Sequence, residues 1–392
     1  MSPFDAARIR LLTWKYKAVG ILSPLRSEGA RLTWKRILNC YLARFEYDRL
    51  RTRLRSRPYK LVVEPTSVCN LRCPACYTGD GQIGRPRTHM SLELYHWLLD
   101  ELGDYLIQID FCNWGEPLLG RNTVAMLQAA HERGIGTQLS TNFSIPFDDA
   151  RADALVASGL AVLGVSLDGA TQATYETYRI GGNLETVLRN CRMVADAKRR
   201  LGSSRPRMVW SYHVFPHNTH EVGMAEAMAR ELGMDFAPSK GWVVGDDWDP
   251  TARWEAPGLD GDTFACMFLW TTAVVNNDGG VSPCCGTFYR EDDMDTLAPG
   301  ADAQDARRFL DVWNGQRFLE ARALYRSRTG PAEVRERVCF DCPKTVAWEN
   351  RQRALAAGVD PRRIPTGYGP NDIFNYFWSR RPEGARQARR GP

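Results

Sequence analysis

Leu61-Val-Val-Glu-Pro-Thr-Ser-Val68 runs directly into Cys69-Asn-Leu-Arg-Cys73-Pro-Ala-Cys76, and these two adjoining stretches decide the fold. The apolar run predicts a buried strand, and the C-x3-C-x2-C spacing places three thiols on the loop that leaves it. Structural zinc takes four protein ligands, whereas a cubane iron–sulfur cluster binds thiolates on separate irons. Three thiols therefore favour a [4Fe–4S] cluster with one open iron over half of a zinc site or unconnected loop cysteines.

A regular alternation of strand and helix patterns follows this loop. Ser91 is expected to cap the first helix, and Gly134, Gly159 and Gly233 to end later ones. Strands are expected over 60–66, 105–112, 135–141, 160–167, 208–215 and 234–244. Such units need parallel strands and right-handed crossovers, so the prediction is an α/β fold with a partial (β/α)6 TIM-like barrel. In such barrels chemistry lies at the carboxyl ends of the strands, where the cysteine loop also lies.

Composition narrows the class of protein. The 392 residues are 44% apolar and 25% charged, which are ordinary values for a globular chain of two or three domains. We find no apolar run long enough for a membrane span and no secretory signal at the N-terminus. The eleven cysteines, mostly in clustered spacings, indicate metal ligands in a reducing compartment, so the cytoplasm is the expected location. Inter-strand aromatics for stacking bases are not evident, so nucleic acid is not an expected partner.

Positive charge is concentrated near the N-terminus. Residues 1–58 hold fourteen Lys or Arg against four acidic residues. Apolar residues at helical spacing predict helices over roughly 3–20 and 29–56. We expect their apolar faces to pack on the catalytic domain and the arginines to stay in solvent, with contact to a membrane surface or an anionic substrate as the alternative. The arginine-rich tail from Arg380 to Pro392 is expected to be disordered.

A second group of cysteines occupies the C-terminal third. Cys266 and Cys284 stand in the pattern C-x12-G-x4-C, and Cys339-Phe-Asp-Cys342 follows after a long insertion. Four thiols from two hairpin-like elements can close a site completely, around zinc or around a second iron–sulfur cluster. Cys285 is adjacent to Cys284 but surplus to such a site.

The first cysteine motif and the segments after the following strands resemble the radical SAM superfamily. The resemblance rests on the three-cysteine motif, on Gly115-Glu116-Pro117, and on Ser166-Leu-Asp168-Gly with the later Arg179. It implies that S-adenosylmethionine chelates the open iron, that Glu116 supplies compensating charge, and that Ser166 and Arg179 contact the ribose and carboxylate. Other contacts to this cofactor are expected from the residues Asn113, Gly115, Pro117, Asn142, Asp168 and, as an apolar wall over adenine, Val214.

The C-terminal cysteines resemble the SPASM extension of the same superfamily, with residues 278–284 as its β-hairpin. No cysteine follows Cys342, so the chain departs towards the shortened twitch type. The resemblance then implies one auxiliary [4Fe–4S] cluster, with the ligands Cys266, Cys284, Cys339 and Cys342. The expected domains are a helical extension (1–58), the catalytic core (59–245), the small hairpin-and-helix cluster domain (246–345) and a C-terminal extension (346–392).

The resemblance also implies the chemistry. S-adenosylmethionine is cleaved reductively to a 5′-deoxyadenosyl radical, with electrons from a donor such as flavodoxin or ferredoxin, and the radical abstracts a hydrogen atom from substrate. Oxidation of the substrate radical needs a base, and epimerisation needs a thiol. The candidates are Asp247 and Arg253 between the domains, and the thiols of Cys112, Cys285 and, less plausibly, Cys40 and Cys191.

A closed auxiliary cluster accepts electrons but cannot bind substrate, which favours oxidation. We therefore expect oxidation or epimerisation of a hydroxylated small molecule such as a sugar or aminocyclitol. A peptide maturase is the main alternative, and a non-catalytic metal-binding scaffold is a remote one.

Overall fold

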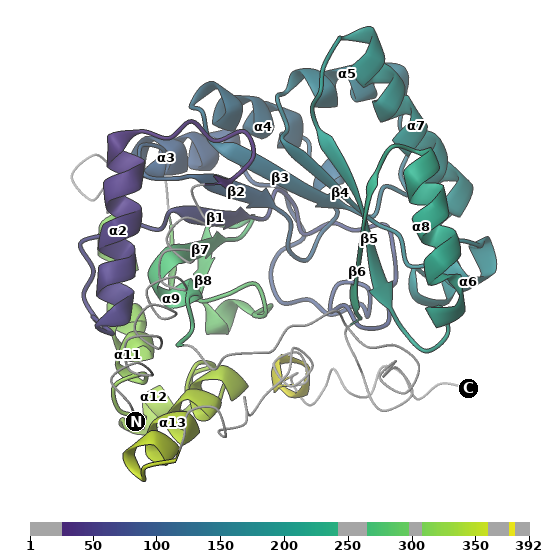
Figure 1. Ribbon diagram of the computed structural model, residues 1–392. Helices are drawn as coiled ribbons and strands as arrows, with labels where there is room; N and C mark the ends of the chain where they lie inside the picture. Colours follow the sequence, from purple (N-terminus) through teal and green to yellow (C-terminus); the bar gives the residue numbers. More distant parts are fainter. Residues whose placement is uncertain (1–25, 242–264, 298–307, 360–375, 381–392) are drawn as a thin grey trace, which may run out of the picture.

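The computed structural model describes residues 26–241, 265–297, 308–359 and 376–380. The expected helix over 3–20, the candidate groups Asp247 and Arg253, and the tail beyond Arg380 lie outside these residues. Figure 1 shows a twisted central sheet with helices along its outer side and a further group of helices contributed by the C-terminal third.

Six parallel strands form the centre of the fold. They follow the sheet order β6-β5-β4-β3-β2-β1, so each strand lies beside the next one along the chain. The strands are β1 (Lys60–Val63), β2 (Gln108–Phe111), β3 (Gly136–Thr141), β4 (Val162–Ser166), β5 (Arg207–Val214) and β6 (Asp235–Lys240). The predicted α/β fold is therefore confirmed, and its six strands lie within the predicted ranges except at the first residue of β5.

Helices connect these strands and cover the outer side of the sheet (Figure 1). They are α3 (Leu92–Leu102), α4 (Thr123–Glu132), α5 (Asp149–Ala157), α6 (Gln172–Tyr178), α7 (Leu184–Arg200) and α8 (Val222–Glu231), with the 3-10 turns η2 (Pro117–Leu119) and η3 (Thr219–Glu221). Ser91 caps α3 as predicted, because its hydroxyl accepts from the Leu94 N–H at 3.1 Å. Gly134, Gly159 and Gly233 end their helices at φ between +65° and +76°. Helix α6 had not been predicted.

The two faces of the strands differ in character. In β5, Met208, Trp210, Tyr212 and Val214 are buried, and they belong to the main core under the helices. The alternating residues of the same strand are more exposed and point to the other, inner face of the sheet. The inner face is the one left free of covering helices α3 to α8, so it is available for a site.

The C-terminal third extends the same sheet. Strand β7 (Thr272–Val275) pairs in parallel with β1, and β8 (Gly280–Ser282) and β9 (Asp295–Thr296) follow in antiparallel order. Gly279 takes φ +86° at the tight turn between β7 and β8, a conformation that favours glycine. The hairpin expected in a separate cluster domain is thus continuous with the catalytic sheet.

Short helices complete this third of the chain. They are α9 (Phe268–Thr271), η5 (Arg290–Asp292), α10 (Phe309–Trp313), α11 (Gln316–Ala323), α12 (Ala332–Arg335) and α13 (Pro343–Ala356). The expected boundary between residues 345 and 346 falls inside α13, so the C-terminal extension begins within a helix that also belongs to the cysteine-rich part.

Helix α2 (Trp34–Asp48) is shorter than the predicted 29–56 and faces the opposite way. Its buried residues include Arg36, Asn39 and Glu46. Its apolar residues Trp34 and Leu38 are 77% and 62% exposed. The expectation that the apolar face packs on the catalytic domain is therefore wrong. The cause is the buried polar side chains, which satisfy backbone groups of the domain and so fix the orientation of the helix.

Candidate functional site

The cysteine loop after β1 forms a small apolar cluster of its own. Cys73 is buried in it and Cys69 and Cys76 pack against it, and the other members are Leu71, Ala75, Tyr178, Phe215 and Trp378. Burial, with the neighbouring thiolates, raises the pKa of Cys69 to about 12 and that of Cys76 to about 11. Such thiolates need a compensating cation, so this donor set fits a cluster of iron ions.

Arg179 brings positive charge to this loop. One of its terminal nitrogens lies 3.8 Å from the Cys73 Sγ, and its Nε donates to Asp168 at 2.6 Å. Burial alone would raise the pKa of Asp168, but Arg179 and His213 lower it to about 2. An ionised, fully buried carboxylate therefore holds Arg179 beside the cluster ligands, where the expected contact with the cofactor carboxylate requires a fixed guanidinium.

His213 belongs to the same group, although no sequence motif indicated it. Its backbone N–H donates to Asp168 Oδ1 at 2.7 Å, and its Nδ1 lies 3.2 Å from that oxygen. The Arg179 Nη2 also lies near this nitrogen, at 3.5 Å. Sharing of a proton between Nδ1 and the nearer Asp168 oxygen would leave Nε2 as an acceptor. His213 lies on the inner face near the end of β5. A histidine at the end of a predicted strand was the sequence signal that could have identified it.

Glu116 lies in the loop after β2 and links it to the segments after β1 and β3. Its backbone N–H donates to the Val68 carbonyl at 2.8 Å. Its carboxylate accepts from Thr141 Oγ1 and from the Asn142 N–H, both at 2.7 Å, and from the Leu118 N–H at 3.0 Å. A Cβ on Gly115 would collide with the backbone carbonyl of Thr66, so only glycine allows this close approach. The Glu116 carboxylate, which was expected to supply charge to the cofactor, is thus hydrogen-bonded to protein donors. These bonds hold the loops after the strands in position.

The other residues expected to contact the cofactor lie in several different places, and not all of them are beside the cysteine loop. Asn142 lies beside the cysteine loop, with its Nδ2 3.8 Å from the Cys69 Sγ, and Ser166 is half-buried at the end of β4. Asn113 instead donates to Asn276 Oδ1 at 3.0 Å, across to the C-terminal hairpin. Pro117 is buried at the start of η2. Val214 is fully buried in the main core on the face of β5 opposite His213, so the prediction that it lines the site is wrong.

The four C-terminal cysteines come together from separate elements. Cys266 precedes α9, Cys284 follows β8, Cys339 lies between α12 and α13, and Cys342 caps α13. Burial raises the pKa of Cys284, and the neighbouring thiolate of Cys285 and those of Cys266, Cys342 and Cys339 raise it further, so all these sulfurs share one electrostatic environment. Among the described residues, no three His, Cys, Asp or Glu side chains lie close enough together to hold a single metal ion. A cubane needs no such convergence, because each thiolate binds a different iron.

Two of the candidate thiols lie near each other. Burial raises the pKa of Cys112 well above its ordinary value, and Asp110 and Cys285 add to the shift. Cys285 is exposed as a residue, yet burial of its thiol raises its pKa; Asp110 raises this pKa further and Lys60 lowers it. Lys60 and Asp110 lie 2.7 Å apart. Cys40 and Cys191 are buried elsewhere in the core, as expected of inert cysteines.

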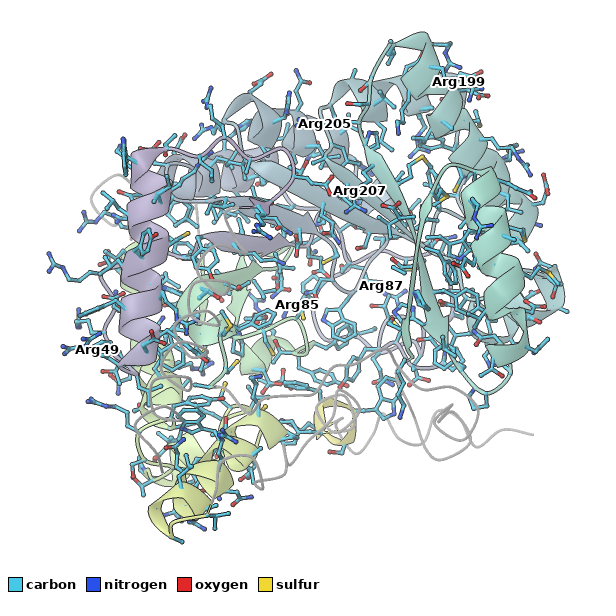
Figure 2. All side chains as sticks on the ribbon, in the orientation of Figure 1. Arg49, Arg85, Arg87, Arg199, Arg205 and Arg207 are labelled. Atoms are coloured by element: carbon cyan, nitrogen blue, oxygen red, sulfur yellow. The ribbon has the colours of Figure 1, made fainter. Side chains whose placement is uncertain are left out.

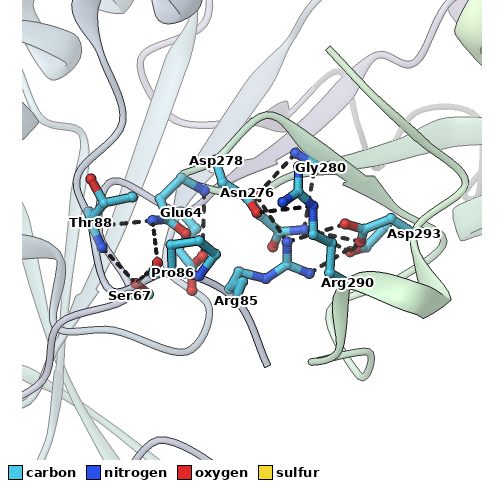
Figure 3. A network of polar contacts seen from close by, with 12 residues as sticks. Glu64, Ser67, Arg85, Pro86, Thr88, Asn276, Asp278, Gly280, Arg290 and Asp293 are labelled. Atoms are coloured by element: carbon cyan, nitrogen blue, oxygen red, sulfur yellow. Dashed lines mark hydrogen bonds and ion pairs between the residues drawn. The ribbon is translucent and has the colours of Figure 1, made fainter. Parts of the chain in front are cut away.

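A buried ion network connects the loop that follows the three cysteines with the C-terminal hairpin (Figure 3). Arg85 donates to Asp278 at 2.9 Å and to Asp293 at 3.1 Å. Glu64 accepts from the Trp114 N–H at 3.1 Å, and burial raises its pKa to about 7. No sequence motif indicated this network, although Glu64 is a carboxylate inside an otherwise apolar segment.

Comparison with known proteins agrees with this geometry. Residues 63–221 match the family model of the Radical SAM superfamily, and residues 266–343 match that of an iron–sulfur cluster-binding domain, SPASM. The chain is 32% identical over 188 residues to a PqqA peptide cyclase of Ruegeria pomeroyi, covering 48% of this chain and 49% of that protein. It is 30% identical over 129 residues to an Fe-coproporphyrin III synthase of Methanosarcina barkeri, covering 32% of each. The chain thus matches half or less of the length of these curated relatives.

Solved structures share the fold. Streptococcus suis SuiB bound to S-adenosylmethionine superposes with a TM-score of 0.51 at 15% identity, covering 78% of this chain and 76% of that one. The protein anSMEcpe with bound AdoMet gives a TM-score of 0.50 at 15% identity, covering 82% and 96%. The two domains imply [4Fe–4S] clusters and S-adenosylmethionine as cofactors. The chain therefore contains a domain of the Radical SAM superfamily followed by an iron–sulfur cluster-binding domain of the SPASM type.

Proposed function

We propose that this enzyme oxidises or epimerises a hydroxylated small molecule, such as a sugar or an aminocyclitol. The observation that supports this substrate class is the polar inner face of the sheet. Its half-buried residues offer hydroxyl, amide, imidazole and carboxylate groups and include Asp110, Gln138, Ser140, Ser166, Ser211 and His213. A face of this kind can exchange hydrogen bonds with several hydroxyl groups, whereas an apolar substrate would offer no partner to the hydroxyls of Ser140, Ser166 and Ser211.

Residues of this chain have distinct roles in the proposal. Cys69, Cys73 and Cys76 would hold the cluster that binds S-adenosylmethionine, and Arg179 would bind the carboxylate of that cofactor. When bound, the cluster and S-adenosylmethionine supply the radical that removes a hydrogen atom from substrate. Burial of the cysteine loop excludes water from the site, which protects such a radical from side reactions.

Epimerisation is supported by the two thiols beside the Lys60–Asp110 pair. A hydrogen atom returned from a thiol to the opposite face of the substrate carbon inverts that carbon. The sulfur then regains one electron and one proton, for which we propose an external one-electron donor such as a flavodoxin or ferredoxin together with solvent. Cys285 is the favoured donor because its side chain is exposed.

Oxidation is supported by His213. The buried Asp168 orients its ring and leaves Nε2 available to accept a proton from a substrate hydroxyl. Loss of that proton and of one electron from the substrate radical gives a carbonyl, with the auxiliary site Cys266, Cys284, Cys339 and Cys342 as the proposed electron acceptor. Asp247 and Arg253 stay candidates for the same task on the basis of sequence alone.

A peptide maturase is the second candidate function. It is favoured by one observation, the 32% identity over 188 residues to a protein named as a PqqA peptide cyclase. The polar inner face is compatible with a peptide that presents polar side chains. A short peptide encoded next to this gene would be the substrate to test first.

The deciding experiment is turnover of reconstituted enzyme with candidate sugars, aminocyclitols and peptides in deuterated water, with 5′-deoxyadenosine and products followed by chromatography and mass spectrometry. Deuterium at carbon that disappears in Cys285→Ala supports epimerisation. A carbonyl product that disappears in His213→Gln supports oxidation. Cys191→Ala serves as the matched control for cysteine loss. If only a peptide stimulates cofactor cleavage, the small-molecule proposal is wrong.

A further inference from the structure

Helix α2 exposes a continuous apolar stripe. Trp34, Leu38, Tyr41 and Phe45 follow one another at intervals of three or four residues, which places them on one side of the helix. Their exposed fractions are 77%, 62%, 48% and 46%. The outer position of α2 at the edge of the molecule is visible in Figure 1. Large apolar side chains gathered in this way mark an interaction surface.

The polar side of α2 fixes this orientation. Arg36 donates to the carbonyls of Gly103 at 3.0 Å and Arg133 at 2.9 Å. These two residues are the C-caps of α3 and α4. Asn39 exchanges two hydrogen bonds with the backbone of Arg57 at 2.9 Å, and Glu46 accepts from Ser56. Rotation of the helix to bury the apolar stripe would leave these buried groups unpaired, so the stripe is held in solvent.

Positive charge flanks the stripe at both ends. Arg31 and Lys35 are exposed at the start of α2, where Lys35 is paired with Asp104 at 2.6 Å. Four exposed arginines follow the end of the helix at every second residue: Arg49, Arg51, Arg53 and Arg55. Figure 2 shows Arg49 extending away from the body of the protein at the end of α2. Arg49 also lies over the ring of Phe45, with its guanidinium carbon 3.7 Å from the ring centroid.

We propose that α2 and the arginines that follow it dock the enzyme on an anionic lipid surface. Trp, Tyr and Phe place an apolar body among lipid chains near the headgroups, and arginines bind the phosphates around them. An apolar stripe along one side of a single helix is typical of a helix that lies in the plane of the membrane–water interface. None of the described helices is long and apolar enough to cross a bilayer.

Charge favours a lipid surface over a second copy of this chain. A two-fold contact through α2 would bring the same arginine run of two copies to the edges of one interface, and like charges there oppose association. An anionic bilayer offers an excess of opposite charge to every arginine at once. The inference is independent of the proposed substrate, because it uses no residue of the cysteine loop or the inner face.

The test is co-sedimentation of the full chain with vesicles of phosphatidylcholine alone and of phosphatidylcholine mixed with phosphatidylglycerol. We expect binding to the mixed vesicles that weakens with added salt. Replacing Arg51, Arg53 and Arg55 by Gln should weaken binding about fivefold for each charge removed. Leu38→Ala combined with Phe45→Ala should weaken it more than tenfold.

Matched controls keep the result interpretable. Met224→Ala removes an apolar residue that is 52% exposed on α8, and Arg205→Gln removes an exposed charge distant from α2; both should bind like wild type. Circular dichroism and cofactor cleavage should be unchanged in all variants, which confirms folding. The proposal is overturned if neutral and anionic vesicles bind equally, or if the α2 variants bind like wild type. It is also overturned if wild type ignores vesicles and forms a dimer that the α2 variants dissociate, because a second copy then covers the stripe.

Discussion

The two cysteine sites are built on different principles. The three-cysteine loop after β1 is surrounded by charged groups that protein contacts hold in place, Arg179 and Asp168 beside Cys73 and Glu116 beneath the loop. The four-cysteine site has its thiols supplied by separate elements and gathers Tyr325 and Lys344 around them. The first arrangement places fixed charge beside its three thiols, and the second offers four thiols. We therefore expect that only the first site takes part directly in radical formation.

Removing a ligand of the first site tests this comparison most strongly. Cys73→Ala should abolish formation of 5′-deoxyadenosine, because two thiolates do not hold the cluster that binds S-adenosylmethionine. The measurement is anaerobic cofactor cleavage with dithionite as reductant. Cys191→Ala, which removes a core cysteine of the same type, should retain cleavage. Wild-type rates in Cys73→Ala would contradict the assignment of the radical site.

Removing two ligands of the second site should separate cleavage from turnover. Cys339→Ala combined with Cys342→Ala should lose about half of the iron, since each cubane holds four irons. The variant should still cleave S-adenosylmethionine but should not complete an oxidation. Iron and sulfide content, electron paramagnetic resonance and product analysis measure these three properties. Loss of cleavage together with product would mean that the two sites are not independent.

Arg179→Gln tests whether the buried ion pair beside the three-cysteine loop is needed for stability and for cofactor cleavage. It leaves Asp168 buried without its cation, which should destabilise the protein by about 3–5 kcal/mol and reduce cofactor cleavage more than tenfold. Chemical denaturation and the cleavage assay check both effects. Arg199→Gln, at an exposed position on α7, should change neither. Stability equal to wild type would show that the Asp168–Arg179 pair is not a structural requirement.

Arg85→Gln tests whether the two regions are mechanically joined. The change removes the buried cation between Asp278 and Asp293 and should cost about 3 kcal/mol of stability. Asp278 and Asp293 belong to the β7–β8–β9 segment that contains Cys284, so we expect weaker retention of the auxiliary cluster in the variant than in wild type during chelator treatment. Arg87→Gln, exposed two residues away, is the control. Auxiliary-cluster retention equal to that of wild type would argue against this connection.

The smallest expected effect is a loss of folding stability at acid pH. The pKa of Asp168 is about 2 in the folded protein, against an ordinary value of 3.8. A lowered folded pKa gives stability that is present above pH 3.8 and is lost as pH falls towards 2. The contribution is about 2 kcal/mol. Unfolding of the apoprotein, measured from pH 5 downward, should therefore steepen over this window (roughly pH 4 to 2) in wild type and less so in Asp168→Asn. An identical pH dependence in the two proteins would contradict the assignment.

The sequence alone determined the parts that depend on local spacing. The strand and helix periods, the cap at Ser91 and the glycines that end helices are properties of a few consecutive residues, and the structure confirms them. The ligand spacing of the cysteines belongs to the same class, because Cys69, Cys73 and Cys76 lie on one loop. The family follows from these patterns, and the comparisons confirm it.

Only the tertiary structure decided what depends on contacts between distant segments. The pairing of β7 with β1, the Asp168–Arg179–His213 group and the Arg85 network join residues that no local pattern links. Helix α2 shows the physical reason: its apolar period predicts burial of the apolar side, but Arg36 finds carbonyl partners only in the folded domain. Paired buried polar groups outweighed the apolar stripe, and that stripe was left in solvent.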